Sequence, residues 1–97
     1  LFRDALVEDP NQTSGWKNLA IACDRSGQSE LALNAIDRAL DLDPDSAAAW
    51  YNRGVINFHQ EKWDAALADL EKAWHLDPND QRISLLLQKV ASAKRGK

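Results

Sequence analysis

Cys23, His59 and His75 are the side chains of this sequence best suited to nucleophilic catalysis or to metal binding. Covalent catalysis needs a nucleophile activated by a neighbouring base, and a zinc site needs several ligands at short spacing. Neither histidine has a second ligand at such a spacing, and the sequence lacks a glycine-rich phosphate loop, an H-E-x-x-H pair and a C-x-x-C pair. We therefore expect no catalytic site, no metal site and no cofactor, and we predict that the chain is not an enzyme.

The acidic residues are numerous, but their pattern is that of a solvated surface. They alternate with basic residues, which favours exposed outer faces and pairing between residues four apart on a helix. The carboxylates interpreted in this way are Asp41, Asp43, Asp45, Asp69 and Glu71.

The net charge is −3, so the chain has no basic surplus of the kind that binds nucleic acid non-specifically. Its C-terminal stretch is nevertheless locally basic. Two interpretations stay open: this end attracts an acidic partner, or it is a solvated, fraying helix end. The basic residues are Arg82, Lys89, Lys94, Arg95 and Lys97, opposed by Asp80.

No apolar run approaches the ~20 residues of a membrane span, and the first residues lack the layout of a signal peptide. The single cysteine excludes an internal disulfide. We expect a soluble segment without membrane contact and favour the cytoplasm over the periplasm. We expect the sequence to begin within a structural element, so that a signal or an anchor could precede it.

The elements that position these side chains follow an internal repeat. An Asp-Pro pair recurs at residues 9–10, 43–44 and 77–78, at intervals of 34 residues, and the same offset relates Trp16 to Trp50. A fixed period of this length is typical of stacked helical repeats.

Each 34-residue unit predicts two helices joined by a short turn. In the first unit, Gly27 predicts a left-handed C-cap, Ser29 an N-cap, and Pro44 the end of the second helix. In the second unit, the turn is expected near 60–62 and the end at Pro78. The expected apolar stripes of the first unit are Trp16, Leu19, Ala20 and Cys23, then Leu31, Ala32, Ala35, Ile36, Ala39 and Leu40. Those of the second are Trp50, Gly54 and Asn57, then Ala66, Leu67, Leu70, Ala73 and Trp74.

This pattern resembles the tetratricopeptide repeat family, whose signature is W-x2-L-G-x2-Y, A-x3-F and Pro with a period of 34. The first unit matches with Trp16-x2-Leu19-Ala20-x2-Cys23, Ala32-x3-Ile36 and Pro44. The second matches with Trp50-x2-Arg53-Gly54-x2-Asn57, Ala66-x3-Leu70 and Pro78.

Four positions depart from the W-x2-L-G-x2-Y part of that signature. Ala20 replaces glycine, Cys23 and Asn57 replace tyrosine, and Arg53 replaces leucine. The resemblance implies that Cys23, at the place of a buried aromatic, is an inert core thiol. Arg53 is expected to lay its stem on the core and carry its charge to the edge.

The resemblance implies an all-α fold of tandem antiparallel helix-turn-helix repeats stacked into a right-handed superhelix, or α-solenoid. We expect one domain over residues 1–97. Its parts are the end of a preceding repeat (1–10), full repeats (13–46 and 47–80), a C-terminal capping helix (81–94) and a frayed tail (95–97).

In this family the first helix of each pair lines a concave groove. The expected groove residues are Lys17, Ile21, Asp24, Arg25, Tyr51, Asn52, Val55, Phe58, His59, Arg82, Leu85 and Lys89. Large apolar groups rimmed by cations would suit a peptide with a carboxylate. The alternative is that Tyr51 and Phe58 only pack against a neighbouring helix.

Some family members clamp the C-terminal carboxylates of chaperone tails. Lys17, Asn52 and Arg82 match three of the five clamp positions, but Ile21 and Leu86 occupy the other two. The resemblance therefore implies at most an incomplete clamp.

The sequence thus predicts a protein–protein interaction module that binds a peptide or protein segment of unknown identity. The alternatives are a structural spacer or self-association segment of a larger scaffold, joined through exposed repeat ends, or the non-catalytic part of a larger enzyme or transport machine.

Overall fold

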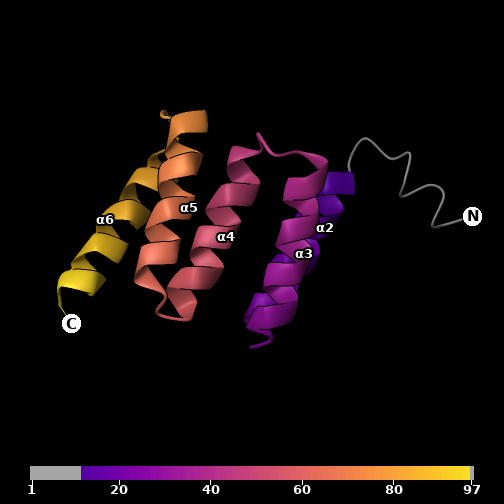
Figure 1. Ribbon diagram of the computed structural model, residues 1–97, viewed down its shortest axis with the longest axis horizontal. Helices are drawn as coiled ribbons and strands as arrows, with labels where there is room; N and C mark the ends of the chain where they lie inside the picture. The colour runs from indigo at the N-terminus through magenta and orange to yellow at the C-terminus, as the bar shows by residue number, and fades with distance from the viewer. Residues whose placement is uncertain (1–11, 97) are drawn as a thin grey trace, which may run out of the picture. The chain divides into compact units, whose positions relative to one another are not determined.

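The computed structural model describes residues 12–96, and within this range the chain folds into α-helices without a strand (Figure 1). The helices form two compact units, one ending at Pro44 and one beginning at Asp45. Residues 1–10, expected to end a preceding repeat, and Lys97 lie outside the described residues. The helices are α2 (Gln12–Arg25) and α3 (Ser29–Leu42) in the first unit, and α4 (Ala47–His59), α5 (Trp63–Leu76) and α6 (Gln81–Arg95) in the second.

The turn between α2 and α3 is closed by a left-handed residue, as predicted: Gly27 has φ 81°. The Gln28 N–H donates to the Cys23 carbonyl at 2.8 Å, and the Gly27 N–H donates to the Asp24 carbonyl at 3.0 Å. This is the bonding pattern of a Schellman motif. The prediction of Ser29 as N-cap is wrong, because the Gln28 carbonyl already accepts the first helical bond and Ser29 is inside α3.

The turn between α4 and α5 repeats this geometry without glycine. Glu61, 34 positions after Gly27, has φ 61°. The Lys62 N–H donates to the Asn57 carbonyl at 2.9 Å, and the Glu61 N–H donates to the Phe58 carbonyl at 3.0 Å. Glu61 therefore adopts the left-handed backbone conformation, which is unfavourable for any residue with a Cβ.

The prolines end the second helix of each pair, as predicted. Asp43 and Asp77, each followed by proline, leave the helical region with φ/ψ of −147°/84° and −145°/79°. The next helices begin at side-chain caps. Ser46 accepts from the Ala49 N–H at 3.1 Å, and Asp80 accepts from the Arg82 N–H at 3.0 Å.

Alanines dominate the core of the first unit. Ala20 on α2 and Ala32 on α3 are fully buried, which lets the two helices approach closely. The expected burial of Leu19 and Leu31 is wrong: they are 48% and 54% exposed. Each precedes a buried alanine by one position, about 100° around the helix. The Cys23 thiol, expected in the core, is only partly buried.

The core of the second unit joins three helices, because α5 packs against both α4 and α6. Gly54 lies so close to α5 that an added Cβ would stand 2.7 Å from Leu70 Cγ. The predicted burial of Trp74 is wrong: it is 41% exposed, because Ala73 supplies the buried face of that turn. The core cluster consists of Ala66, Leu70, Leu86 and Val90, with Tyr51, Val55, Phe58, Trp63, Leu67 and Leu87 packed against it.

A buried polar pair lies between α4 and α5. Asn57 Nδ2 donates to Asp69 Oδ2 at 2.7 Å, and both residues are more than 90% buried. The Arg53 Nε lies 3.7 Å from the same carboxylate oxygen, with its guanidinium 5.9 Å from the Trp50 ring. The prediction that Asp69 is solvated is wrong. Its carboxylate faces Arg53 and Asn57, the two polar residues of α4 that replace the leucine and the tyrosine of the repeat signature.

Candidate functional site

Four of the predicted groove residues meet at a hollow of about 400 Å³ between α4 and α6, which we call the α4–α6 hollow. The hollow contains two cations, Arg82 and Lys89. They are seven residues, or two turns, apart on α6, so both lie on one face of the helix. None of the lining side chains is acidic. The hollow is lined by Tyr51 of α4 and by Arg82, Leu85, Leu86, Gln88 and Lys89 of α6.

Leu85 forms the apolar part of this surface. It is 61% exposed, whereas its neighbour Leu86 is 9% exposed and belongs to the core cluster. Tyr51 is half-buried and packs against that same cluster. Covering an exposed leucine contributes about 1–2 kcal/mol, so Leu85 is a favourable contact for an apolar side chain of a partner.

Arg82 is held by two neighbours at the rim of the hollow. Its Nη2 donates to Asp80 Oδ2 at 2.8 Å, its Nε donates to Asp80 Oδ1 at 3.2 Å, and its guanidinium lies 5.1 Å from the centre of the Tyr51 ring. The hydrogen bonds from the Arg82 side chain hold the pKa of Asp80 below its usual range, and Asp80 in turn raises the pKa of Arg82. Lys89 is exposed and makes no ion pair with another residue of the 12–96 range.

The remaining predicted residues of α4 lie beside the hollow. Val55 and Phe58 are half-buried against the core cluster, and the Phe58 ring lies 5.6 Å from the Trp63 ring and 5.9 Å from the His59 ring. For Val55 and Phe58 the packing interpretation therefore accounts for most of the side chain. Asn52 is half-buried, and His59 is exposed.

The predicted residues of α2 belong to the first unit. Lys17, Ile21 and Asp24 are half-buried there, and Arg25 is exposed. The α4–α6 hollow belongs to the other compact unit.

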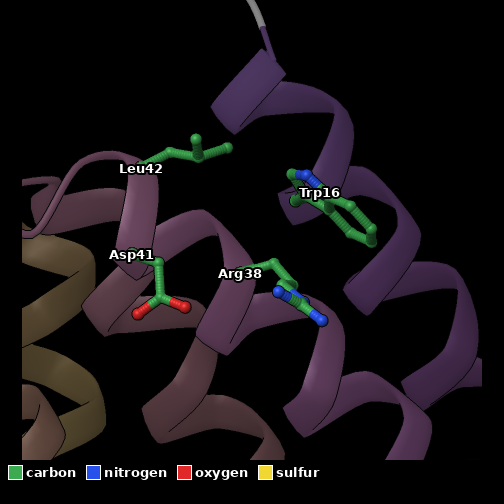
Figure 2. A pocket seen from close by; sticks show the side chains of 4 residues that line it. All are labelled: Trp16, Arg38, Asp41 and Leu42. Atoms are coloured by element: carbon green, nitrogen blue, oxygen red, sulfur yellow. The ribbon is translucent and has the colours of Figure 1, made fainter. Parts of the chain in front are cut away.

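The first unit has a hollow of its own, of about 300 Å³, lined by Trp16, Arg38, Asp41 and Leu42 (Figure 2). Figure 2 shows the Trp16 ring on α2 and the Arg38 side chain on α3, with Leu42 one turn further along. Trp16 is half-buried and Leu42 is 48% exposed. This surface offers apolar contact but no nucleophile.

Catalytic chemistry finds no convergent groups in the described part of the chain. Residues 12–96 hold no cluster of three or more His, Cys, Asp or Glu residues able to bind a metal ion. The His59 ring makes a tilted contact with Phe58, and the His75 ring makes an edge-on contact with Trp74, each the neighbour in sequence. None of the described helices is both long and apolar enough to cross a membrane.

Sequence reasoning missed two polar residues that shape this region. Asp80 was interpreted only as part of the charge balance, although an aspartate directly before a helical stripe is a recognised N-cap signal. Gln88 was not assigned to the groove, although it lies one turn beyond Leu85 on α6.

Comparison with known proteins adds the following. The sequence model of the tetratricopeptide repeat matches residues 17–91. The first TPR of Spaghetti (RPAP3) bound to HSP90 peptide SRMEEVD is 24% identical, with a TM-score of 0.85, over 97% of this chain and 76% of that chain. A structure of the UNC-45 chaperone, described by its molecular features critical for binding and folding muscle myosin, is 24% identical, with a TM-score of 0.78, over 90% of this chain and 10% of that chain. At this identity the structures share the fold, and no curated protein matches the chain.

Proposed function

We propose, since the chain belongs to the tetratricopeptide repeat family, that it binds a peptide or an extended segment of a partner protein in the α4–α6 hollow. The family consists of protein-interaction modules built from stacked helix pairs. The observation that carries the proposal is an exposed Leu85 flanked on one helix face by Arg82 and Lys89.

The lining favours a ligand with an apolar side chain beside a carboxylate. Leu85 and Tyr51 suit the apolar side chain, and the positive charge on this face of α6 suits the acid. The peptide in the similar Spaghetti structure, SRMEEVD, combines a valine with acidic residues. In this chain Ile21 and Leu86 occupy two of the five positions of a full carboxylate clamp. The proposal is therefore a shallower, more apolar site than such a clamp.

The proposed organisation keeps residues 13–46 and 47–80 as repeats, with α6 as the capping helix. Ile83, Leu86 and Val90 of α6 are buried in the second unit, whereas Gln81, Gln88 and Ser92 are exposed. A helix with one buried and one polar face supports the role of a cap.

Fluorescence anisotropy with a labelled SRMEEVD peptide tests the proposal through two pairs of variants. Leu85→Ser is expected to weaken binding about 5- to 10-fold, from the loss of roughly 1 kcal/mol of apolar contact. Lys89→Glu is expected to weaken it at least as much. The matched controls are Leu31→Ser, an exposed leucine in the first unit, and Lys72→Glu, an exposed lysine on α5.

Equal losses in the variants and in their controls would remove the support for the hollow. Association that grows with protein concentration alone would instead favour the self-association alternative. The exposed Leu31 and Trp74 are then the first residues to substitute.

A further inference from the structure

The two cations of the α4–α6 hollow, Arg82 and Lys89, differ in whether an anion is paired with them. Arg82 donates two parallel hydrogen bonds, from Nε and Nη2, to the two oxygens of Asp80. This side edge is one of the two edges of a guanidinium that match a carboxylate in geometry. Asp80 therefore occupies one edge of Arg82 and offsets its charge, so a ligand carboxylate is attracted less strongly to Arg82 than to an unpaired cation.

The face of Arg82 is engaged as well. Its guanidinium carbon lies 5.1 Å from the centre of the Tyr51 ring, within the range of a cation–π contact. With its edge on Asp80 and its face on Tyr51, the guanidinium is held in one orientation. In that orientation, the guanidinium and the Tyr51 ring together form one wall of the hollow.

Asp80 is itself fixed in place. It caps α6 by accepting the Arg82 backbone N–H at 3.0 Å, and its side chain is 18% exposed. Hydrogen bonds from Arg82 lower the pKa of Asp80, so the carboxylate is ionised at neutral pH. A competing ligand would have to displace an anion that the helix start holds in position.

Among the described residues, Lys89 has neither an ion pair nor a cation–π contact of the kind that Arg82 makes. It lies two turns along α6 from Arg82, with Leu85 and Leu86 between them on the same face. It is exposed and forms no ion pair with any residue of the 12–96 range. Its ammonium group is therefore available to an incoming carboxylate.

We infer that Lys89, and not Arg82, binds the carboxylate of an apolar–acidic peptide segment in the hollow, and that Asp80 sets this preference by occupying Arg82. The inference rests on the proposed function. It assigns to Asp80 the role of a specificity-determining residue, and to Arg82 that of a platform beside Tyr51. The occupant is a segment whose apolar side chain covers Leu85 and whose acidic group follows it toward Lys89.

The test uses the 97-residue chain with two small probes, N-acetyl-leucine and its neutral counterpart N-acetyl-leucinamide, followed by NMR. In the wild type, the acid is expected to shift the Lys89 side-chain signals and to leave the Arg82 Nε–H signal in place. Asp80→Asn keeps the N-cap and removes the competing charge. In that variant the Arg82 Nε–H signal is expected to respond, and the preference for acid over amide to rise about two- to fivefold.

Three further variants separate this specific competition from a general change of charge. Lys89→Gln is expected to lower the acid-over-amide preference about two- to fivefold. The double variant Arg82→Gln/Asp80→Asn removes the ion pair without changing the net charge beside the hollow, and it is expected to leave that preference unchanged. Asp64→Asn makes the same charge change beside Lys94, away from the hollow, and is expected to leave the preference unchanged.

A response of Arg82 Nε–H in the wild type with silent Lys89 signals would overturn the inference. So would an acid-over-amide preference that falls in the double variant as far as it falls in Lys89→Gln. Failure of the proposed function looks different, since neither probe would then shift Tyr51, Leu85 or Lys89 at millimolar concentration, and both proposals would fall.

Discussion

Replacing Asn57 with alanine would remove the amide that donates to the buried carboxylate of Asp69. The donor and acceptor atoms are 2.7 Å apart, Asn57 is 3% exposed and Asp69 is 6% exposed. Water therefore has little access to replace the lost donor. The Arg53 Nε lies 3.7 Å away and compensates only in part.

The expected loss follows from the burial of this pair. A hydrogen bond to a charged group is worth about 1.5–3 kcal/mol, and an unsatisfied buried acceptor has a cost in the same range. We expect Asn57→Ala to lower the free energy of unfolding by about 2–3 kcal/mol. The whole domain has about 5–15 kcal/mol, so Tm should fall by roughly 10–20 °C.

Urea denaturation followed by circular dichroism measures this loss. Asn52→Ala is the matched control, because it makes the same change at a half-buried position of α4, and it should lie within about 0.5 kcal/mol of the wild type. A double-mutant cycle with Asp69→Ala should give a coupling energy above about 1 kcal/mol. A loss below about 0.5 kcal/mol for Asn57→Ala, or additive effects in the cycle, would refute the reasoning.

Three further changes test the fold. Glu61→Gly should raise the free energy of unfolding by about 0.5–1 kcal/mol, because φ is 61° there; a loss in denaturant titration would contradict this. Gly54→Ala should cost about 1–3 kcal/mol, because the new Cβ would stand 2.7 Å from Leu70 Cγ; unchanged stability would show that Leu70 moves freely. Arg82 lowers the pKa of Asp80 from 3.8, so this carboxylate stabilises the fold above about pH 4 and loses that effect as pH falls through the lowered value. The Tm difference between wild type and Asp80→Asn should therefore close in acid, and a gap that widens would contradict the assignment.

The ends of the helices were predictable because local chemistry sets them. Proline excludes helical geometry from Asp43 and Asp77, and Gly27 supplies a left-handed turn. Glu61 shows the limit of this reasoning. Nothing in its side chain favours a positive φ, and only the position it shares with Gly27 in the repeat indicates the conformation.

Burial was predicted less well, because one helix does not reveal how far its neighbours extend around it. Trp74 continues the apolar stripe of α5 in sequence, but Leu70 and Ala73 already fill the contact face. The buried Asn57–Asp69 pair required knowledge of which faces meet. A polar residue at the aromatic position of the repeat was the available signal.

Four of the six side chains that line the α4–α6 hollow are among the predicted groove residues, but the pairing of Arg82 with Asp80 was not predicted. Tyr51, Arg82 and Lys89 share a surface because the repeat register places them on facing helices. The bond between Arg82 and Asp80 depends on side-chain conformation at the start of α6, which periodicity does not determine.

An amide chemical-shift map of the chain during titration with SRMEEVD peptide tests the central claim most directly. The account predicts saturable shifts that cluster on Tyr51, Leu85 and Lys89, around the α4–α6 hollow. Shifts centred on the exposed Leu31 or Trp74 instead, or no shifts at millimolar peptide, would contradict it.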